Sequence, residues 1–382
     1  MKRVIITTGG TGGHIFPAIA VAEEIKARYR DATVLFMGGK YGPEGDLAAQ
    51  AGLEFVGLPV RGFLGRGLGM LGAGFGMLRG LTKAVIVMRR FKPDAVIGFG
   101  GYAAFAGVMA ARYVGVPSAI HEQNSIPGVA NKLLAKRVDR VFVSLPDVKA
   151  VFPEEKTIFT GNPVRAAIAD LARVHDDPES EDMPEKEPGK RVLILGGSQG
   201  ARAINDCVIN NLNALIDGGY SLWHQAGAAD FERVRDAYRK NGGEKMRVDG
   251  FIRDMAAAYT WADIVVCRAG ATTIAELTCA GLPAVFIPFP AATHDHQTHN
   301  ARYMAAVGAA ELLPQSKIEP VRGNPALLVE RLEALFADPE KLPAMGTASR
   351  GLARPEAAAA LVNAMEEAAA GREEENSAIP EG

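Results

Sequence analysis

The residues with the clearest chemical potential lie in a turn near the amino terminus, where residues 9–14 read GGTGGH. Glycines at a strand-to-helix turn allow positive φ and let a ligand approach the backbone closely. The start of the next helix offers N–H groups and the positive end of the helix dipole, which favour phosphate. His14 is the side chain of this turn that exchanges a proton near neutral pH. The turn indicates a phosphate-binding site with a base beside it, and a tight turn with a core-facing histidine is the alternative.

The elements that must position this turn follow from the hydrophobic pattern. Short apolar runs at 4–6, 34–37, 94–98, 118–120 and 140–144 alternate with helical patterns. Strands separated by helices indicate βαβ units and a parallel sheet. Several of these runs end in glycine or polar clusters, and ligands of parallel α/β sheets bind at the carboxyl ends of the strands. We therefore predict an α/β fold with its site on that edge.

The same pattern begins again in the second half of the chain. An apolar run at 191–195 leads into GGSQG at 196–200 and a helix from about Ala201, and further runs follow to 284–287. The chain from 324 to about 370 is expected to be helical, with a break near Pro343. With 382 residues, the chain is long enough for two cores. We predict two similar domains, each with a phosphate-type turn.

The charge distribution separates a basic body from two acidic pieces. The net charge is −2, yet residues 174–190 and 366–382 each carry −5, which leaves +8 for the remainder. A basic body suits anionic small molecules or an anionic membrane surface, and the chain has no module of the kind that binds nucleic acid. The three cysteines have no metal-ligand spacing, and we expect reduced, buried thiols.

The stretch from 61 to 90 differs from the rest because it is rich in Gly, Leu and Met with interleaved basic residues. Such a stretch could rest on an anionic membrane. An ordinary crossover helix with its core face inward is an equal alternative. The residues before the first glycines are too few for a secretory signal. No apolar run reaches the ~18 residues that span a bilayer.

Other glycine-loop and metal chemistries fit poorly. Neither loop has the G-x-G-x-x-G spacing with a following acid that binds dinucleotides, and neither has the lysine of a P-loop. The cluster of His294, Asp295, His296 and His299 reads as a helix start with polar residues facing a ligand, and zinc is the weaker interpretation. Ser198 lies in GGSQG at 196–200, and we expect it to cap a helix or bind phosphate rather than act as a nucleophile.

Seven motifs occur in an order that carries a family likeness. Together they make the chain similar to the MurG family of bacterial cell-wall N-acetylglucosaminyltransferases over residues 1–365. The motifs are GGTGGH at 9–14, GFGGY at 98–102, HEQN at 121–124, GNPVR at 161–165, GGSQGA at 196–201, RAGATTIAEL at 268–277 and DHQTHNA at 295–301.

The resemblance implies the glycosyltransferase-B fold, an α/β architecture of two Rossmann-like domains whose parallel sheets face a cleft. It implies an acceptor- and membrane-facing domain at 1–163, to which a helix at about 345–370 returns. A donor domain for UDP-GlcNAc would span 164–344, and residues 371–382 are expected to form a disordered tail.

The resemblance also assigns roles to single residues. His14 and Glu122 are the candidate catalytic bases. Glu276 would accept the ribose hydroxyls of the donor, Ile252 would face uracil through its backbone, and Gln297 would contact the sugar. The candidate donor-binding residues are Thr11, Gly12, Gly13, Asn124, Arg165, Ser198, Ile252, Arg268, Ala271, Thr272, Thr273, Glu276 and Gln297. The candidate acceptor-side residues are Gly10, Tyr102 and Asn131, besides the two candidate bases. The chain has His296-Gln297 where some members have paired glutamines, which puts one sugar contact in doubt.

The implied reaction is inverting transfer of GlcNAc from UDP-GlcNAc to the muramoyl sugar of a polyprenyl-diphosphate-linked muramoyl peptide, with no tightly bound metal or other cofactor. It belongs to peptidoglycan synthesis and hence to cell shape and division. The expected place is the cytoplasmic face of the inner membrane, as a peripheral protein, with cell-wall and division proteins as further partners. Two alternatives stay open: a glycolipid or natural-product glycosyltransferase of the same fold, and a non-catalytic protein that binds nucleotide sugars or lipid diphosphates.

Overall fold

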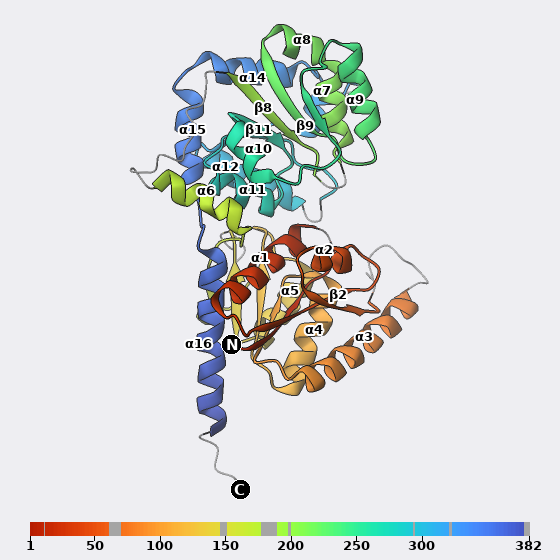
Figure 1. The fold of residues 1–382 in the computed structure, drawn as a ribbon, viewed down its shortest axis with the longest axis vertical. Helices are drawn as coiled ribbons and strands as arrows, with labels where there is room; N and C mark the ends of the chain where they lie inside the picture. Colours follow the sequence, from red (N-terminus) through yellow and green to blue (C-terminus); the bar gives the residue numbers. More distant parts are fainter. Residues whose placement is uncertain are drawn as a thin grey trace. The chain divides into compact units, whose positions relative to one another are not determined.

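The computed structural model describes residues 1–10, 12–60, 70–145, 151–176, 189–197, 200–292, 295–320 and 323–377, without the side chains of 70–73, 175–176 and 372–377. The chain forms two compact units (Figure 1). Unit 1 comprises Met1–Arg165 and Glu356–Gly382, and unit 2 comprises Ala166–Pro355.

Unit 1 is built on a parallel sheet of seven strands among the described residues, in the order β3-β2-β1-β4-β5-β6-β7. The order reverses direction between β1 and β4, which is the switch point where ligands of doubly wound sheets bind. The strands are β1 (Arg3–Thr7), β2 (Thr33–Gly39), β3 (Glu54–Leu58), β4 (Ala95–Gly98), β5 (Ser118–Glu122), β6 (Arg140–Val143) and β7 (Thr157–Phe159).

Helices cover both faces of this sheet because successive strand residues point to opposite sides. Ile6 packs with residues of α1, α2 and α16 on one face, while Ile5 packs with α3 and α4 on the other. The carboxyl-terminal helix α16 lies beside α1 (Figure 1), where Tyr29 donates a hydrogen bond to Glu366. The helices are α1 (Gly12–Arg28), α2 (Glu44–Gln50), α3 (Met70–Phe91), α4 (Gly101–Val114), α5 (Val129–Leu134) and α16 (Ala357–Ser377).

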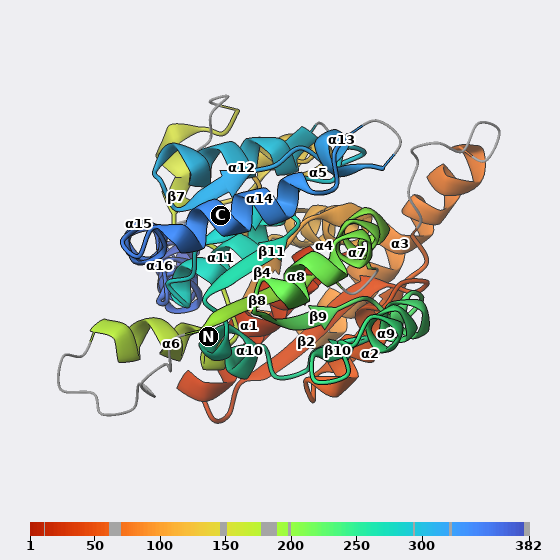
Figure 2. The same ribbon diagram turned by 90° about the horizontal axis from the view of Figure 1, so that it is seen from above.

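Unit 2 repeats the arrangement with six described strands in the order β10-β9-β8-β11-β12-β13, part of which can be followed in Figure 2. All neighbouring pairs are parallel, with Ile194 opposite both His224 and Val266. The strands are β8 (Lys190–Leu195), β9 (Tyr220–Gln225), β10 (Arg247–Asp249), β11 (Ile264–Cys267), β12 (Ala284–Phe286) and β13 (Ala310–Leu312).

The main core of unit 2 lies on the sheet face covered by α7, α8, α9 and α14, where Ile194 and Val266 are buried. Helix α6 contacts both α10 and α11. The helices are α6 (Ala166–Asp176), α7 (Arg202–Asn210), α8 (Leu212–Asp217), α9 (Phe231–Lys240), α10 (Met255–Trp261), α11 (Ala271–Cys279), α12 (His296–Ala306), α13 (Gln315–Ile318), α14 (Leu327–Ala337) and α15 (Lys341–Arg350). The predicted α/β fold with two parallel-sheet domains is confirmed.

Two sequence expectations for the carboxyl-terminal part are wrong. The helix expected at about 345–370 is two helices, since α15 ends at Arg350 in unit 2 and α16 begins at Ala357 in unit 1. The expected break near Pro343 is present at 338–340, between α14 and α15, and Pro343 itself lies in the first turn of α15, where a proline is tolerated. The tail expected from residue 371 is helical as far as Ser377, because α16 continues through its acidic end.

Candidate active site

Two glycine motifs of unit 1 meet at the carboxyl edge of its sheet. The amide of Gly9 donates to the carbonyl oxygen of Gly100 over 3.0 Å, which joins the turn after β1 to the turn after β4. Gly101 has φ +82°, and a Cβ there would overlap the carbonyl oxygen of Gly9. Only glycine permits both the backbone conformation and this close approach. The motifs GGTGGH at 9–14 and GFGGY at 98–102 are far apart in sequence and therefore form one surface only in the fold.

His14, in the first turn of α1, is half-buried against this surface. An ideal Cβ on Gly100 would lie 3.1 Å from Cδ2 and Nε2 of the His14 ring, and one on Gly10 would lie 3.5 Å from Nδ1. The two glycines thus make room for the ring. His121 at the end of β5 is close enough to interact with His14 electrostatically.

His121 is fully buried, and burial lowers its pKa to about 4. Its Nε2 lies 3.1 Å from the carbonyl oxygen of Gly161 and 3.2 Å from Oγ of Ser144, and its Nδ1 lies 3.1 Å from Nε2 of Gln123. A neutral ring can satisfy these contacts with one donor and one acceptor nitrogen. His121 therefore adds no positive charge beside His14 at neutral pH.

Glu122, the second candidate base, is 3% exposed and accepts hydrogen bonds at both carboxylate oxygens. The amide of Asn124 donates to Oε1 over 3.0 Å, and the amide of Gly128 and Nδ2 of Asn131 each donate to Oε2 over 2.9 Å. Asn131 also donates to the carbonyl oxygen of His121. The carboxylate braces the turn between β5 and α5, and the candidate residues Asn124 and Asn131 are part of this brace.

Glu44 is a residue of this edge that sequence reasoning missed. Its side chain is 2% exposed, and Oε1 accepts the amide of Gly10 over 3.1 Å. Gly38, Gly39 and Gly42 surround it closely enough that a Cβ on any of them would press on the carboxylate or its chain. The amide of Gly10 is therefore directed at a carboxylate. The glycines after β2 were the only available sequence signal.

The other unit 1 candidates lie around the same turn. Gly12 begins α1 and Gly13 is exposed in its first turn, while Tyr102 is half-buried in the first turn of α4. The guanidinium of Arg165 lies over the ring of Phe16, 5.5 Å from its centroid. Thr11 lies outside the described residues.

In unit 2 the candidate donor residues gather at the carboxyl edge of the second sheet. The amide of Ile252 donates to Oε1 of Gln225 over 3.0 Å, and the amide of Gly196 donates to the Gln225 carbonyl oxygen over 2.9 Å. Gln225, which was not singled out from sequence, thereby connects the loops after β8 and β10. Ser198 lies outside the described residues.

Arg268 follows β11 and holds the neighbouring loop. Its Nη1 donates to the carbonyl oxygens of Ile287 and Pro288 over 2.9 and 3.1 Å, and Nη2 donates to Oε1 of Gln315 over 2.8 Å. Its guanidinium also lies 5.4 Å from the centroid of the Phe289 ring. Burial lowers the pKa of Arg268 to about 10. These contacts fix the ends of β12 and α13.

Helix α11 begins directly after this arginine, with Gly270 as the residue before its first turn. Ala271, Thr272 and Thr273 form that turn at the carboxyl end of β11. A helix start at a sheet edge favours an anion through its dipole. Glu276, one turn further along, is 7% exposed, and its Oε2 accepts the hydroxyl of Tyr259 over 2.8 Å.

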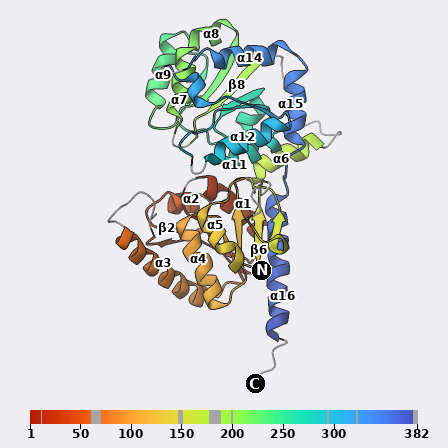
Figure 3. The same cartoon turned by 180° about the vertical axis from the view of Figure 1, so that it is seen from behind.

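Helix α12 contributes the last candidate, Gln297. Its Oε1 accepts the amide of Phe289 over 3.0 Å, so the side chain is held against the loop after β12. Asn300 in the same helix is fully buried and donates to the carbonyl oxygen of Ala269, which ties α12 to the start of α11 (Figure 3). The proposed metal cluster is only partly described, because His294 lies outside the described residues.

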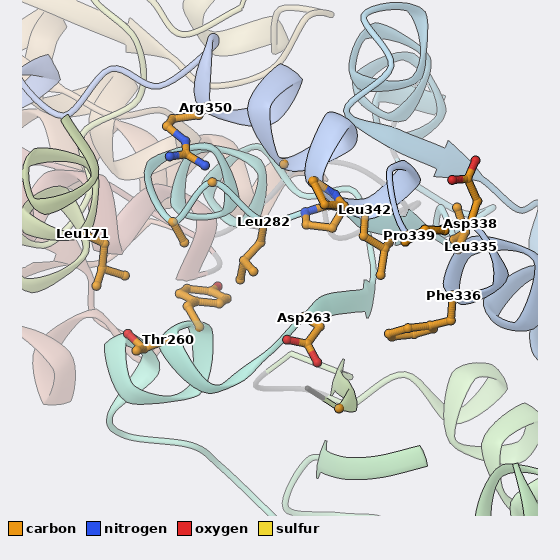
Figure 4. A pocket seen from close by; sticks show the side chains of 17 residues that line it. Leu171, Thr260, Asp263, Leu282, Leu335, Phe336, Asp338, Pro339, Leu342 and Arg350 are labelled. Atoms are coloured by element: carbon orange, nitrogen blue, oxygen red, sulfur yellow. The ribbon is translucent and has the colours of Figure 1, made fainter. Parts of the chain in front are cut away.

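A cavity of about 440 Å³ in unit 2 lies at the opposite edge of the sheet. Gly189, Asp263 and Pro283, which precede β8, β11 and β12, contribute to its lining. Figure 4 shows Leu171 and Thr260 on one side of it, Leu282 and Arg350 on another, and Phe336 further along. This cavity is therefore separate from the edge that carries Glu276 and Gln297.

The described part of the chain contains neither a metal-binding cluster nor a helix that could cross a membrane. No group of three or more His, Cys, Asp or Glu side chains there is arranged to hold a metal ion. No described helix combines the length and the apolar character needed to cross a bilayer. Cys207, Cys267 and Cys279 are buried thiols, as expected, and burial raises their pKa values.

Comparison with known proteins places this geometry in a family. The glycosyltransferase family 28 N-terminal domain matches residues 4–143, and the C-terminal domain of the same family matches residues 191–361. The chain is 58% identical over 367 residues to the UDP-N-acetylglucosamine--N-acetylmuramyl-(pentapeptide) pyrophosphoryl-undecaprenol N-acetylglucosamine transferase of Nitratidesulfovibrio vulgaris strain DP4, covering 96% of this chain and 98% of the relative. The protein of the same name from Lawsonia intracellularis is 43% identical, with 94% and 96% covered.

A solved structure agrees with these relatives. The crystal structure of Acinetobacter baumannii MurG superposes with a TM-score of 0.75 at 31% sequence identity, covering 96% of this chain and 100% of that one. Sequence and fold therefore give the same answer over almost the whole chain. The chain belongs to glycosyltransferase family 28 and, within it, to the MurG family that the motifs indicated.

Proposed function

We propose that this glycosyltransferase moves GlcNAc from UDP-GlcNAc to the muramoyl sugar of a polyprenyl-diphosphate-linked muramoyl pentapeptide, with inversion, as a step of peptidoglycan synthesis. The observation that carries the proposal is the 58% identity, over 96% of the chain, to a transferase whose name states this donor and this acceptor. The geometry of each unit supplies a role for the residues involved.

The donor binds unit 2 in this proposal. The start of α11 supports the diphosphate through its dipole and backbone amides. Glu276 accepts the ribose hydroxyls, for which a held carboxylate is suited. Ile252 faces the uracil through its backbone, and Gln297 contacts the sugar through the amide nitrogen that its hydrogen bond to Phe289 does not use. Arg268 acts indirectly, because its guanidinium already donates to three protein oxygens.

The acceptor binds unit 1, and His14 is the base. A base must remove the proton of the acceptor hydroxyl as the new bond forms. His14 is half-buried at the glycine edge, and an imidazole is the side chain best suited to general-base work near neutral pH. Glu122 is a poorer candidate, since both of its oxygens are occupied by protein donors. Its role is to hold Asn124, Gly128 and Asn131 in place.

The departing UDP carries the charge that develops in the transfer. The dipole of α11 stabilises this charge, with Arg165 as the proposed cationic partner. The reaction then needs no tightly bound metal, and we expect excess EDTA to leave kcat within twofold of its value in metal-free buffer. A loss of activity in EDTA, restored by a divalent cation, would contradict that part of the proposal.

The test of the whole proposal is turnover of UDP-GlcNAc with a short-chain polyprenyl-diphosphate muramoyl pentapeptide, followed by UDP release and by the mass of the disaccharide product. A matched reaction contains a glycolipid acceptor of similar chain length without the muramoyl peptide. Product with the muramoyl acceptor alone supports the proposal. Product with the glycolipid alone would assign another acceptor class, and binding of UDP-GlcNAc without turnover on either would indicate a non-catalytic protein.

A second test isolates the donor site. Glu276→Ala removes the proposed ribose contact, and since hydrogen bonds to charged groups contribute about 1.5–3 kcal/mol, the donor KM should rise about 10- to 100-fold with kcat nearly unchanged. An unchanged donor KM would remove Glu276 from the ribose. The KM for the acceptor serves as the internal control.

We also propose that α3 rests on an anionic membrane surface at the cytoplasmic face of the inner membrane, beside other proteins of cell-wall synthesis and division. The interpretation of residues 61–90 as a crossover helix has support, because one face of α3 packs into the core through Ala84 and Met88. The interpretation as a membrane-resting stretch has support from the opposite face. The other face exposes Phe75 and Leu78, each 61% exposed, and Ile86. No acidic residue occurs between Glu54 and Asp94 in the sequence, so the basic residues here face no opposing charge from their own segment. Residues 61–69 lie outside the described residues.

Vesicle binding tests the membrane proposal. The double variant Arg79→Glu/Lys83→Glu should lose binding to vesicles of phosphatidylglycerol and phosphatidylethanolamine, since each basic residue near an anionic surface contributes about 1 kcal/mol. Arg239→Glu/Lys240→Glu in α9 makes the same charge change on another exposed helix and should bind almost normally. Equal binding by both double variants would contradict the assignment.

A further inference from the structure

The buried pair Tyr259–Glu276 links two helices of unit 2. Tyr259 lies in α10, whose first turn is fixed by Asp254 as its Oδ1 accepts the amide of Ala257 over 2.9 Å. The Tyr259 side chain is 1% exposed, and its hydroxyl donates to Oε2 of Glu276 over 2.8 Å. A buried phenol needs a hydrogen-bond partner, and a carboxylate is a strong one. The pair therefore fixes α10 and α11 to each other and fixes one oxygen of Glu276.

Fixing that oxygen changes what Glu276 can do. A glutamate has three rotatable side-chain bonds, and ordering such a side chain on binding costs about 0.5–1.5 kcal/mol. A carboxylate offers about four lone-pair sites, so one that accepts the Tyr259 hydroxyl can also accept other hydroxyls. The hydrogen bond thus holds Glu276 in one orientation before a ligand arrives.

Tyr259 reaches Glu276 from the side away from the candidate donor edge. It lines the cavity at the amino-terminal edge of the sheet, together with its neighbour Thr260 and with Leu282 (Figure 4). The candidate donor residues follow the carboxyl ends of the same strands. Tyr259 can therefore act on a ligand at the donor edge through Glu276, without touching it.

We propose that Tyr259 is a positioning residue for the donor: its hydroxyl orients the Glu276 carboxylate so that it accepts the ribose hydroxyls of UDP-GlcNAc. This inference rests on the proposed donor role of Glu276. Its consequence is that affinity for the ribose depends on a hydroxyl that never contacts the nucleotide. Because the effect acts through the ribose contact alone, it should disappear when the ribose hydroxyls are removed.

The test is Tyr259→Phe, which deletes the hydroxyl and keeps the ring. We expect the Kd for UDP, measured by calorimetry, to rise about tenfold, while the Kd for 2′,3′-dideoxy-UDP changes less than twofold. In turnover the donor KM should rise by the same factor, with kcat and the acceptor KM unchanged. A merely structural loss would weaken both nucleotides alike, and that result would overturn the inference.

Tyr238→Phe is the matched control. Tyr238 is 2% exposed in the same unit, and its hydroxyl is bonded to Nδ1 of His224 over 3.1 Å, so the variant also deletes one buried hydroxyl. We expect it to destabilise the protein in urea to a similar degree and to leave both nucleotide affinities unchanged. If it instead weakened UDP selectively, as Tyr259→Phe should, the specific link to Glu276 would be contradicted.

Glu276→Ala separates the inference from the proposal beneath it. If Glu276→Ala leaves the Kd for UDP unchanged, the donor role of Glu276 is wrong, and the inference fails with it. If Glu276→Ala weakens UDP while Tyr259→Phe does not, only the inference fails. If the donor role of Glu276 and the positioning role of Tyr259 both hold, the double variant Tyr259→Phe/Glu276→Ala should bind UDP no more weakly than Glu276→Ala alone. The reason is that the Tyr259 hydroxyl then has no carboxylate to orient.

Discussion

The two sheets share the same order over six strands, but the charged residues at their carboxyl edges have opposite roles. At the unit 1 edge, the Glu122 carboxylate accepts from four N–H donors of three residues, and the His14 ring lies close to Gly10 and Gly100. At the unit 2 edge, the cation is the group that holds the loops, since Arg268 donates to three protein oxygens, and the carboxylate of Glu276 accepts the Tyr259 hydroxyl.

The difference distinguishes charged residues that hold loops in place from charged residues that act on a ligand. A buried charge is costly unless protein groups satisfy it, so a saturated charge is committed to holding its own loops. Glu122 and Arg268 are such groups. His14 and Glu276 lie at the edges that these two groups hold in place. We accordingly expect the chemistry from His14 and Glu276 and not from the two residues that hold the loops.

The variant His14→Ala tests this comparison with the largest expected effect. General-base catalysis contributes about 10²- to 10⁴-fold, so kcat at saturating substrates should fall about 10³-fold while the donor KM changes little. Steady-state kinetics on both substrates measures this. Lys240→Ala, at the exposed end of α9 in unit 2, is the control and should retain kcat within a few-fold. A near-normal kcat in His14→Ala would mean that another group is the base.

Glu122→Gln tests the brace. The amide nitrogen of glutamine would face N–H donors that now meet a carboxylate, so we expect a loss of about 2–3 kcal/mol in the free energy of unfolding of unit 1. Urea unfolding followed by a probe in unit 1 measures it. If Glu122 were the base in place of His14, Glu122→Gln would instead lower kcat by orders of magnitude and leave the stability unchanged. That result would reverse the assignment.

Acid should destabilise both units through their buried histidines. The pKa values of His121 and His224 are lowered by burial to about 4 and about 3, so each ring is neutral when folded. The unfolded rings, with pKa about 6.5, bind more protons as the pH falls below 6.5, and the stability that is complete above this pH is then lost. At pH 5 the loss is about 2 kcal/mol for each histidine.

Urea unfolding at pH 7.5 and pH 5 measures this loss. His224→Gln removes the titrating ring of unit 2, and the transition of that unit should then depend less on pH, while unit 1 keeps its dependence. Equal stability at both pH values in the unaltered protein would show that the histidines are not neutral in the fold.

The smallest expected effect comes from the space around His14. Gly100→Ala places a Cβ 3.1 Å from the His14 ring at a φ of +91°. Gly115→Ala has a comparable φ of +79° with no atom within 4 Å of its Cβ among the described residues, so it shares the backbone strain without the contact. We expect both to lose about 1 kcal/mol of stability and Gly100→Ala alone to lose about tenfold in kcat. Equal kcat values would mean that the ring tolerates displacement.

The sequence by itself determined the repeated strand–glycine–helix pattern, the two-domain parallel architecture and the family. These follow from hydrophobic period and local turn chemistry, which are written in neighbouring residues. The same local signals placed His14 and Glu276 near helix starts. They failed at 345–370, where one helical pattern is divided between two units, because periodicity carries no information on which core a helix joins.

Only the tertiary structure decided which candidate residues use their hydrogen bonds to hold loops of the protein. Glu44 reaches Gly10 from 34 residues away, and Gln225 meets Ile252 from 27 residues away. Tyr259 meets Glu276 across two helices. Whether a polar group is a brace or a site depends on donors and acceptors that strand order brings together, and that pairing is a property of the folded chain, not of any local stretch.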